Sequence, residues 1–214
     1  MTQRLSEFGT ACRDYTEKWQ TLDQTLYRLC QENPGHSTWA SVAAKVWIIG
    51  RTFASGIERQ IPTRNTQGSS LSQLTDYILT KRRTVEAIFG DLAEIAEPLT
   101  PGRLKAIVGA HGRFVKMLQP LLRRRQSARS FASKYMHFHC PAVPLYDTYA
   151  AEALHHLYRW EDRFEVFTLP DNADEWYAWH AMQFWQLYQD ARKRGKTVTV
   201  RLVDYYLLWV AEDL

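Results

Sequence analysis

The stretch from residue 129 to 147, RSFASKYMHFHCPAVPLYD, holds a lysine, two histidines, a cysteine and a closing aspartate within nineteen positions. Ser130 is suited to cap a helix that starts there. Aromatic residues then recur at steps of four and three, so they share one helix face: Phe131, Tyr135 and Phe138. Lys134 lies between them on the same side. The spacing therefore predicts a lysine amine close to aromatic side chains.

The environment of Lys134 decides which chemistry it can do. A lysine that loses hydration against aromatic rings is more easily deprotonated, and a neutral amine is the form that attacks a carbonyl carbon or the C1′ atom of a sugar. Alternatively, the side chain extends along the apolar surface and its charge reaches water or a phosphate. The residue types alone favour the second interpretation.

Asp147 closes the stretch after a turn, CPAVP, whose two prolines restrict the backbone to an extended path. An aspartate at this point can cap the following helix. It is also the first acidic residue after a long basic segment. A single carboxylate at the end of a basic groove can stabilise the positive charge that develops on a sugar when its glycosidic bond breaks. We therefore expect Asp147 to face C1′ of a nucleotide.

The charge of the chain is uneven. Residues 98 to 146 contain no Asp or Glu, whereas the rest of the chain has 18 basic and 23 acidic residues. The acid-free segment holds nine basic side chains: Arg103, Lys105, Arg113, Lys116, Arg123, Arg124, Arg125, Arg129 and Lys134. A solvated helix face explains three or four such charges. A run of this length favours a polyanionic partner, with nucleic acid first among the candidates.

Metal and cofactor motifs are not evident. His137 and His139 alternate and Cys140 follows, while His155 and His156 are adjacent, and neither set has the ligand spacing of a zinc site. The sequence contains no Walker loop, no GxGxxG and no GxSxG. We therefore expect neither a metal nor a cofactor.

The remaining composition indicates a folded protein of the cytoplasm. Aromatic residues make up 13% of the 214 residues, which a disordered chain would not carry. No apolar run reaches the roughly 18 residues that cross a membrane, and the N-terminus has no apolar signal region. Three cysteines, odd in number and widely spaced, indicate reduced thiols.

Hydrophobic periodicity predicts an all-α chain of about eight helices in a single domain. Apolar residues at three- and four-residue steps predict a long first helix over residues 3–32 and a second, largely buried helix over 38–59. A third helical region covers 71–96, with a break near LTKRR. Further helices are predicted from these start signals: Thr100 with Pro101, Asp147, a capping box of Asn172 with Glu175, and Thr199.

A lysine on one helix, a short turn, and an aspartate at the start of the next helix resemble the helix-hairpin-helix DNA glycosylase superfamily. The motif SFASKYMHFHCPAVPLYD is similar to a divergent bacterial branch with members that look like phage-defence enzymes excising modified bases. The specific resemblance covers residues 120 to 160. Where the superfamily has a Gly-hydrophobic-Gly hairpin turn, this chain has SARSFAS, and the interval from Lys134 to Asp147 is thirteen positions.

The resemblance implies a compact, two-lobed helical fold that spans residues 1–214, with segment 98–147 facing double-stranded DNA, and a monomer. It implies that Asp147 and, in a bifunctional enzyme, Lys134 are catalytic. The implied DNA-binding residues are Arg123, Arg124, Arg125, Arg129, Ser130 and Ser133. The superfamily flips its target base into a pocket, for which the candidates are Trp47, Arg51, Glu58, Tyr135 and His137.

Three functions stay open at this point. The first is a DNA glycosylase that releases a flipped, modified base, such as a modified cytosine of phage DNA, and leaves an abasic site. The second is a non-catalytic DNA-binding protein of a defence or regulatory system, which the same basic segment would serve. The third is a helical scaffold whose basic face meets an acidic protein.

Overall fold

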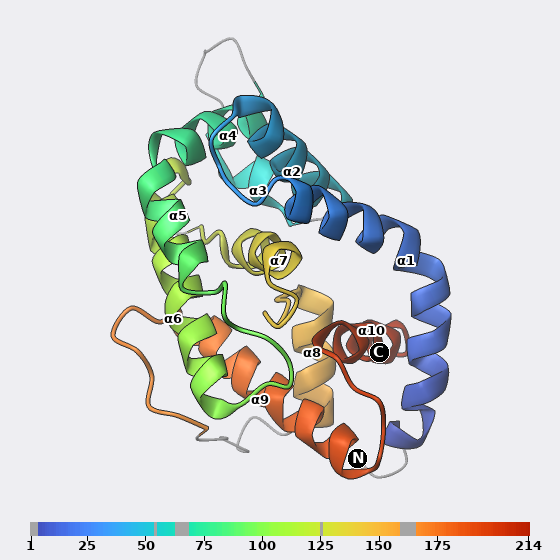
Figure 1. Ribbon diagram of the computed structural model, residues 1–214. Helices are drawn as coiled ribbons and strands as arrows, with labels where there is room; N and C mark the ends of the chain where they lie inside the picture. The colour runs from blue at the N-terminus through green and yellow to red at the C-terminus, as the bar shows by residue number, and fades with distance from the viewer. Residues whose placement is uncertain (1–3, 54, 63–68, 125, 159–165) are drawn as a thin grey trace.

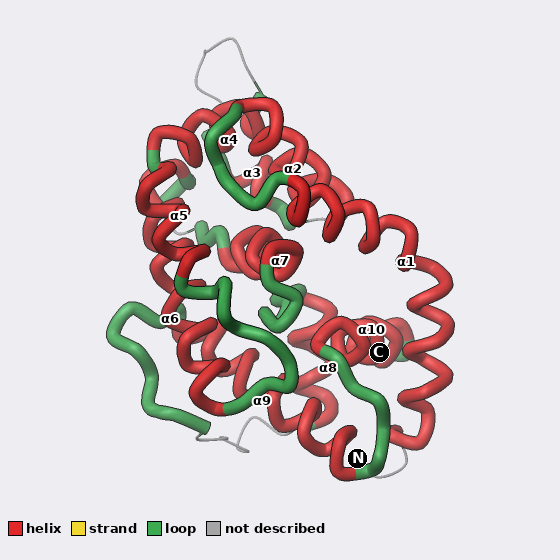
Figure 2. The backbone as a smooth tube through the Cα atoms, in the orientation of Figure 1, coloured by secondary structure: helices red, strands yellow, loops and turns green. Residues whose placement is uncertain are grey.

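The computed structural model describes residues 4–53, 55–62, 69–124, 126–158 and 166–214, and within these ranges it is built from helices joined by loops, without a strand (Figures 1 and 2). The prediction of an all-α fold is therefore confirmed. In chain order, the elements are η1 (Arg4–Glu7), α1 (Phe8–Glu32), α2 (Trp39–Thr52), α3 (Ile57–Gln60), α4 (Ser70–Thr80), α5 (Arg82–Gly90), α6 (Pro101–Leu118), η2 (Gln119–Leu121), α7 (Arg129–His139), α8 (Thr148–Leu157), α9 (Glu175–Lys193) and α10 (Val200–Glu212).

Side-chain caps start several helices where the sequence predicts them. Thr100 accepts a hydrogen bond from the Arg103 N–H before α6, and Thr199 accepts one from the Leu202 N–H before α10. The predicted capping box at Asn172 is wrong, because Asp174 caps α9 through the Tyr177 N–H. Ser130 does not cap α7 either, since the helix begins at Arg129.

The predicted second helix breaks into two. α2 ends at Thr52, and α3 starts after Gly56, whose φ of 70° lies in the left-handed region that glycine adopts without strain. Ser55 donates a hydrogen bond to the Gly50 carbonyl at 3.1 Å and so binds one of the last carbonyls of α2. The break matters for the site, because the carbonyl of Phe53 is no longer used by a helix.

Helix α7 lies at the centre of the molecule, with α1, α2 and α6 packed around it (Figure 1). Its residues from Phe131 to Phe138 are all buried, including Ser133, Lys134 and His137. The polar side chains of such a helix must find partners inside the protein, because an unpaired buried polar group is destabilising. These partners form the candidate site.

The remaining helices frame α7 on two sides. α2 packs against α4 on one side, while α10 packs against both α1 and α8 on the other (Figure 1). The long helix α1 runs along both groups and packs against both α7 and α10. Among the described residues, no helix combines the length and apolar character needed to cross a membrane.

Candidate active site

Lys134 projects from α7 into a fixed polar environment. Only 4% of its side chain is exposed. Its Nζ donates to Oδ2 of Asp147 at 2.6 Å and to the carbonyl oxygen of Phe53 at 2.7 Å. Both acceptors come from outside α7, so the amine is held by three segments of the chain. Because a buried ammonium needs such partners to be stable, this arrangement is specific to the folded protein.

Asp147 occupies the N-cap of α8, as the sequence predicts. Its Oδ1 accepts from the Tyr149 N–H at 3.0 Å, while Oδ2 accepts from Lys134. The positive end of the helix dipole favours a carboxylate at this position. The side chain retains 21% exposure, so the carboxylate is anchored on one side and open on the other.

The turn between Lys134 and Asp147 is held in place by side chains from α7 and α9. Ser133 accepts from the Tyr146 N–H at 2.9 Å. The carbonyls of the turn are bonded in succession by His137 (Val143, 2.8 Å), Tyr177 (Pro144, 2.8 Å) and His180 (Leu145, 2.7 Å). Burial lowers the pKa of His137 to about 3 and that of His180 to about 4, so both rings are neutral near pH 7. The distance between the lysine and the aspartate is therefore imposed by the fold.

A cavity of about 260 Å³ opens beside this pair. Its volume lies just below the range of roughly 300–1,000 Å³ that is typical of small-molecule sites, which suits a single flat ring system. It is lined by Trp19, Thr52, Phe53, Lys134, Leu145, Asp147, Tyr149, Arg201, Asp204 and Leu208.

The α10 wall of the cavity carries an ionic cluster that the sequence analysis did not identify. Arg201 binds Asp23 of α1 through two nitrogens, at 2.5 and 2.7 Å, and binds Asp204 at 2.6 Å. Burial raises the pKa of Asp204 to about 6, against the opposing effect of Arg201. A signal existed in the sequence: Arg201 and Asp204 stand three apart on an otherwise apolar helix, and so share a face.

Aromatic side chains form another part of the cavity. The rings of Trp19 and Phe53 lie 6.4 Å apart, and the Arg201 guanidinium lies 5.7 Å from the Phe53 ring. The Trp19 Nε1–H is buried and finds no hydrogen-bond partner among the described residues. A flat aromatic ligand could stack against these rings. The periodicity of α1 indicated only a buried face for Trp19.

The five residues predicted for a base pocket lie elsewhere. Arg51 forms an ion pair with Glu58 at 3.0 Å and covers the ring of Trp47 at 4.7 Å. Tyr135 is fully buried and contacts the rings of Phe89 and Phe114. His137 is buried between the turn and Tyr27. None of the five predicted residues lines the cavity beside Lys134 and Asp147.

The predicted DNA-binding residues differ in their accessibility. Arg123 and Arg124 are exposed, and the Arg123 N–H donates to the Gln60 carbonyl at 2.8 Å, which joins this loop to α3. Arg125 lies outside the described residues. Ser133 is fully buried, so it cannot contact DNA, and Ser130 is half-buried. Arg129 is bound to Asp174 at 2.7 Å.

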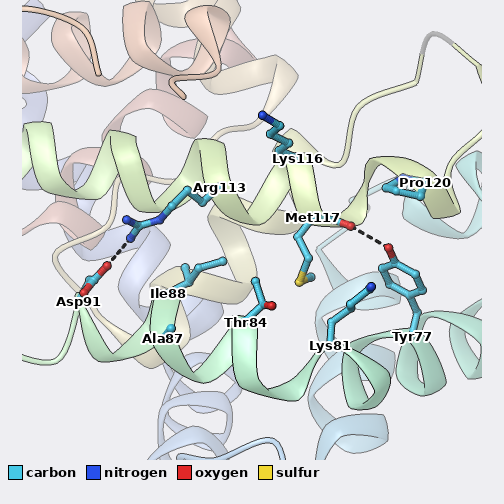
Figure 3. A pocket seen from close by; sticks show the side chains of 10 residues that line it. All are labelled: Tyr77, Lys81, Thr84, Ala87, Ile88, Asp91, Arg113, Lys116, Met117 and Pro120. Carbon is cyan, nitrogen blue, oxygen red and sulfur yellow. Dashed lines mark hydrogen bonds and ion pairs between the residues drawn. The ribbon is translucent and has the colours of Figure 1, made fainter. Parts of the chain in front are cut away.

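Other cations of the acid-free segment line a second concavity, between α5 and α6 (Figure 3). This groove has a volume of about 560 Å³ and a largely apolar floor. Arg113 is paired there with Asp91, and the Tyr77 hydroxyl donates to the Met117 carbonyl at 3.0 Å (Figure 3). Lys116 is exposed at its edge. The cations of the basic segment thus differ in environment: some are exposed, some are ion-paired and Lys134 is buried.

Metal ligands do not gather in the part of the chain that is described: there, no group of three or more His, Cys, Asp or Glu side chains is placed to hold a metal ion. Cys12, Cys30 and Cys140 are buried free thiols. In comparisons with protein-family models, curated proteins and solved structures, no match was found. The contacts of Lys134 and Asp147 carry the functional assignment that follows.

Proposed function

We propose that this protein is a DNA glycosylase that acts in the cytoplasm on a flipped, modified base. The observation that carries the proposal is the 2.6 Å contact between Lys134 and Asp147 at the wall of a cavity sized for one ring system. The motif resemblance to the helix-hairpin-helix glycosylases supports it independently, because that superfamily uses a lysine and an aspartate in the same order along the chain.

The chemistry requires a negative group near the sugar. As the C1′–N bond of a nucleotide lengthens, positive charge develops on the sugar. A carboxylate that is already in place stabilises this charge without reorganising during the reaction. Asp147 meets the requirement, because two hydrogen bonds fix its oxygens and part of the side chain remains exposed to the cavity.

Lys134 supports the covalent version of this reaction. An ammonium group carries three protons, and two of them are directed to Asp147 and Phe53. When the proton of the Lys134–Asp147 hydrogen bond moves to Asp147, the amine becomes neutral and its nitrogen lone pair can attack C1′. A nitrogen–C1′ bond then forms while the C1′–base bond breaks, and the electron pair leaves with the base. Ring opening of the sugar would convert the adduct into a Schiff base.

The DNA partner is supported by exposed cations of the acid-free segment. Arg123 and Arg124 are exposed and lie in the loop that bonds to Gln60, the last residue of α3. Phosphates of double-stranded DNA would bind such a loop, and the binding would weaken with salt. The phage origin of a modified target base follows from the motif resemblance.

The decisive experiment measures the bases released from DNA. Genomic DNA from phages with modified cytosines, and unmodified DNA, would be incubated with the protein, and free bases identified by mass spectrometry. We expect one modified base to be released by the wild type and not by Asp147→Asn, with Asp213→Asn, an exposed aspartate after α10, as the matched control. Base release that is unchanged in Asp147→Asn would remove the mechanism.

Borohydride trapping separates the two versions of the chemistry. The wild type should form a covalent adduct with the DNA, and Lys134→Gln should not, although its amide can still donate to Asp147 and Phe53. An adduct that survives Lys134→Gln would assign the nucleophile elsewhere. Base release without any adduct would indicate attack by water. Salt-sensitive DNA binding without any released base would support the non-catalytic binding protein in place of the enzyme.

A further inference from the structure

The α10 wall of the cavity holds a carboxyl group, that of Asp204, which has no role in the proposed reaction as described above. Asp204 lines the same cavity as Lys134 and Asp147, and α10 packs directly against α8 (Figure 1). Only 3% of the Asp204 side chain is exposed. Its Oδ2 accepts from Arg201, which leaves Oδ1 as the oxygen that can carry a proton.

We infer that Asp204 is the acid that gives a proton to the departing base. The inference rests on the proposed glycosylase function and adds a catalytic residue to it. A base that leaves with the electron pair of the C1′–N bond is an anion and needs a proton on a ring nitrogen or oxygen. A carboxylic acid at the cavity wall can supply that proton as the bond breaks.

Charge balance places the proton on Asp204. Two cations, Lys134 and Arg201, form hydrogen-bonded ion pairs with three carboxyl groups in this region. With all three ionised, the cluster would hold an uncompensated negative charge, which burial disfavours strongly. Arg201 is already neutralised by its two bonds to Asp23, and Asp147 is paired with Lys134. Asp204 is the least exposed of the three carboxyl groups, so it is the one that binds the proton.

The surroundings of Asp204 favour its protonated form on balance. Burial has the largest effect and, together with the nearby carboxylates, raises its pKa to about 6, while the two cations oppose this. The groups that interact with Asp204 are Tyr15, Asp23 and Tyr27 on α1, Lys134 on α7, Asp147 at the start of α8, and Arg201 on α10. Below about pH 6, Asp204 therefore carries the proton that the role of an acid requires.

The step balances without a further reagent. The C1′–N bond breaks and its electrons go to the base, which takes the proton from Asp204 and leaves neutral. Asp204 becomes a carboxylate beside Arg201, which stabilises it, while positive charge appears on the nitrogen that joins Lys134 to the sugar. Proton uptake from water then restores the acid before the next reaction.

Single-turnover base release as a function of pH tests this role. The substrate is DNA holding the base that the wild type releases in the preceding experiment. We expect the wild-type rate to fall as pH rises above about 6, since the acid form is lost. Asp204→Asn, which keeps an oxygen for Arg201, should lower the rate at pH 6 by about 100-fold and remove the pH dependence on this limb. Asp204→Glu should restore part of the rate, and Asp213→Asn should match the wild type.

Each other outcome has a definite meaning. If the wild-type rate does not fall with rising pH, Asp204 is not the acid, and this holds even if the variants do not fold. If Asp204→Asn is slower but keeps the wild-type pH profile, the residue only positions Arg201, and the inference is overturned. If Asp204→Asn equals the wild type while Asp147→Asn is inactive, the proposed function stands without this step. If no DNA yields a free base, both proposals fail together.

Discussion

Lys116 and Lys134 belong to the same acid-free segment of the sequence, yet the fold places them in opposite environments. Lys116 is exposed at the edge of the open groove between α5 and α6 (Figure 3), and an exposed ammonium is fully hydrated. Lys134 is buried in the central helix with two fixed acceptors and a cavity beside it. An excess of charge along a sequence therefore indicates a binding partner of opposite charge, whereas a buried cation with fixed contacts beside a cavity indicates a catalytic role.

A pair of aspartates provides the strongest test of this comparison. Asp91 binds Arg113 at the groove, and Asp147 binds Lys134 at the cavity, so each variant to Asn removes one carboxylate from one ion pair. We expect Asp147→Asn to lower base release by about a thousandfold, because the charge at C1′ loses its counter-ion. Asp91→Asn should change it by less than about twofold, since exposed ion pairs contribute little. Comparable losses in single-turnover rates would show that the two regions act together.

The two lysines should also differ in what they contribute to stability. Lys134→Ala would remove the cation that pairs with Asp147 and the donor to the Phe53 carbonyl, at a cost of about 3–5 kcal/mol in the free energy of unfolding. Lys116→Ala should stay within about 0.5 kcal/mol, because it removes an exposed charge. Urea unfolding monitored by circular dichroism measures both. A Lys134→Ala protein as stable as the wild type would mean that the contact forms at no gain in stability.

The sequence predicts one side of the site and not the other. Periodicity places Lys134 on a short helix, and a cap signal places Asp147 at the start of the next helix, because both features depend on neighbours within about four positions. Phe53, Arg201 and Asp204 reach the cavity through contacts between helices distant in sequence. Periodicity identifies which face of a helix is buried, but the partner of that face follows only from the packed structure.

The base-pocket prediction illustrates this difference. Arg51 and Glu58 do form an ion pair, but they do so across the break between α2 and α3 and not along one continuous helix. The break after Thr52, together with the left-handed Gly56, turns the chain so that Thr52 and Phe53, instead of Arg51, line the cavity. The position of a break within an apolar run depends on tertiary contacts that outweigh local helix propensity.

The turn that carries Asp147 should make the protein sensitive to acid. The unfolded state binds a proton on each histidine below about pH 6.5, whereas buried His180 stays neutral to about pH 4. The unfolded state therefore binds more protons, and stability falls as pH falls, by on the order of 2 kcal/mol for one such histidine between pH 6.5 and 5. Asp204 contributes with the opposite sign, because its raised pKa makes the folded state bind the extra proton.

The contribution of His180 can be isolated by substitution. Urea unfolding of His180→Gln should show a loss of stability between pH 6.5 and 5 that is smaller than the wild-type loss by about 2 kcal/mol. Exposed His156→Gln should retain the wild-type pH dependence. Equal slopes for all three proteins would mean that His180 accepts a proton in the folded state, contrary to its hydrogen bond with the Leu145 carbonyl and its burial.

The smallest expected effects belong to the exposed arginines, whose role is binding. Arg123→Ala and Arg124→Ala should each weaken DNA binding modestly and lower the slope of log affinity against log salt by about 1, since each removes one phosphate contact. Fluorescence anisotropy over a salt series measures the slope. Base release at saturating protein should be unchanged, because neither side chain lines the cavity. An unchanged slope for both variants would indicate that DNA binds to the groove cations instead. Lys116→Ala should then lower the slope in the same titration.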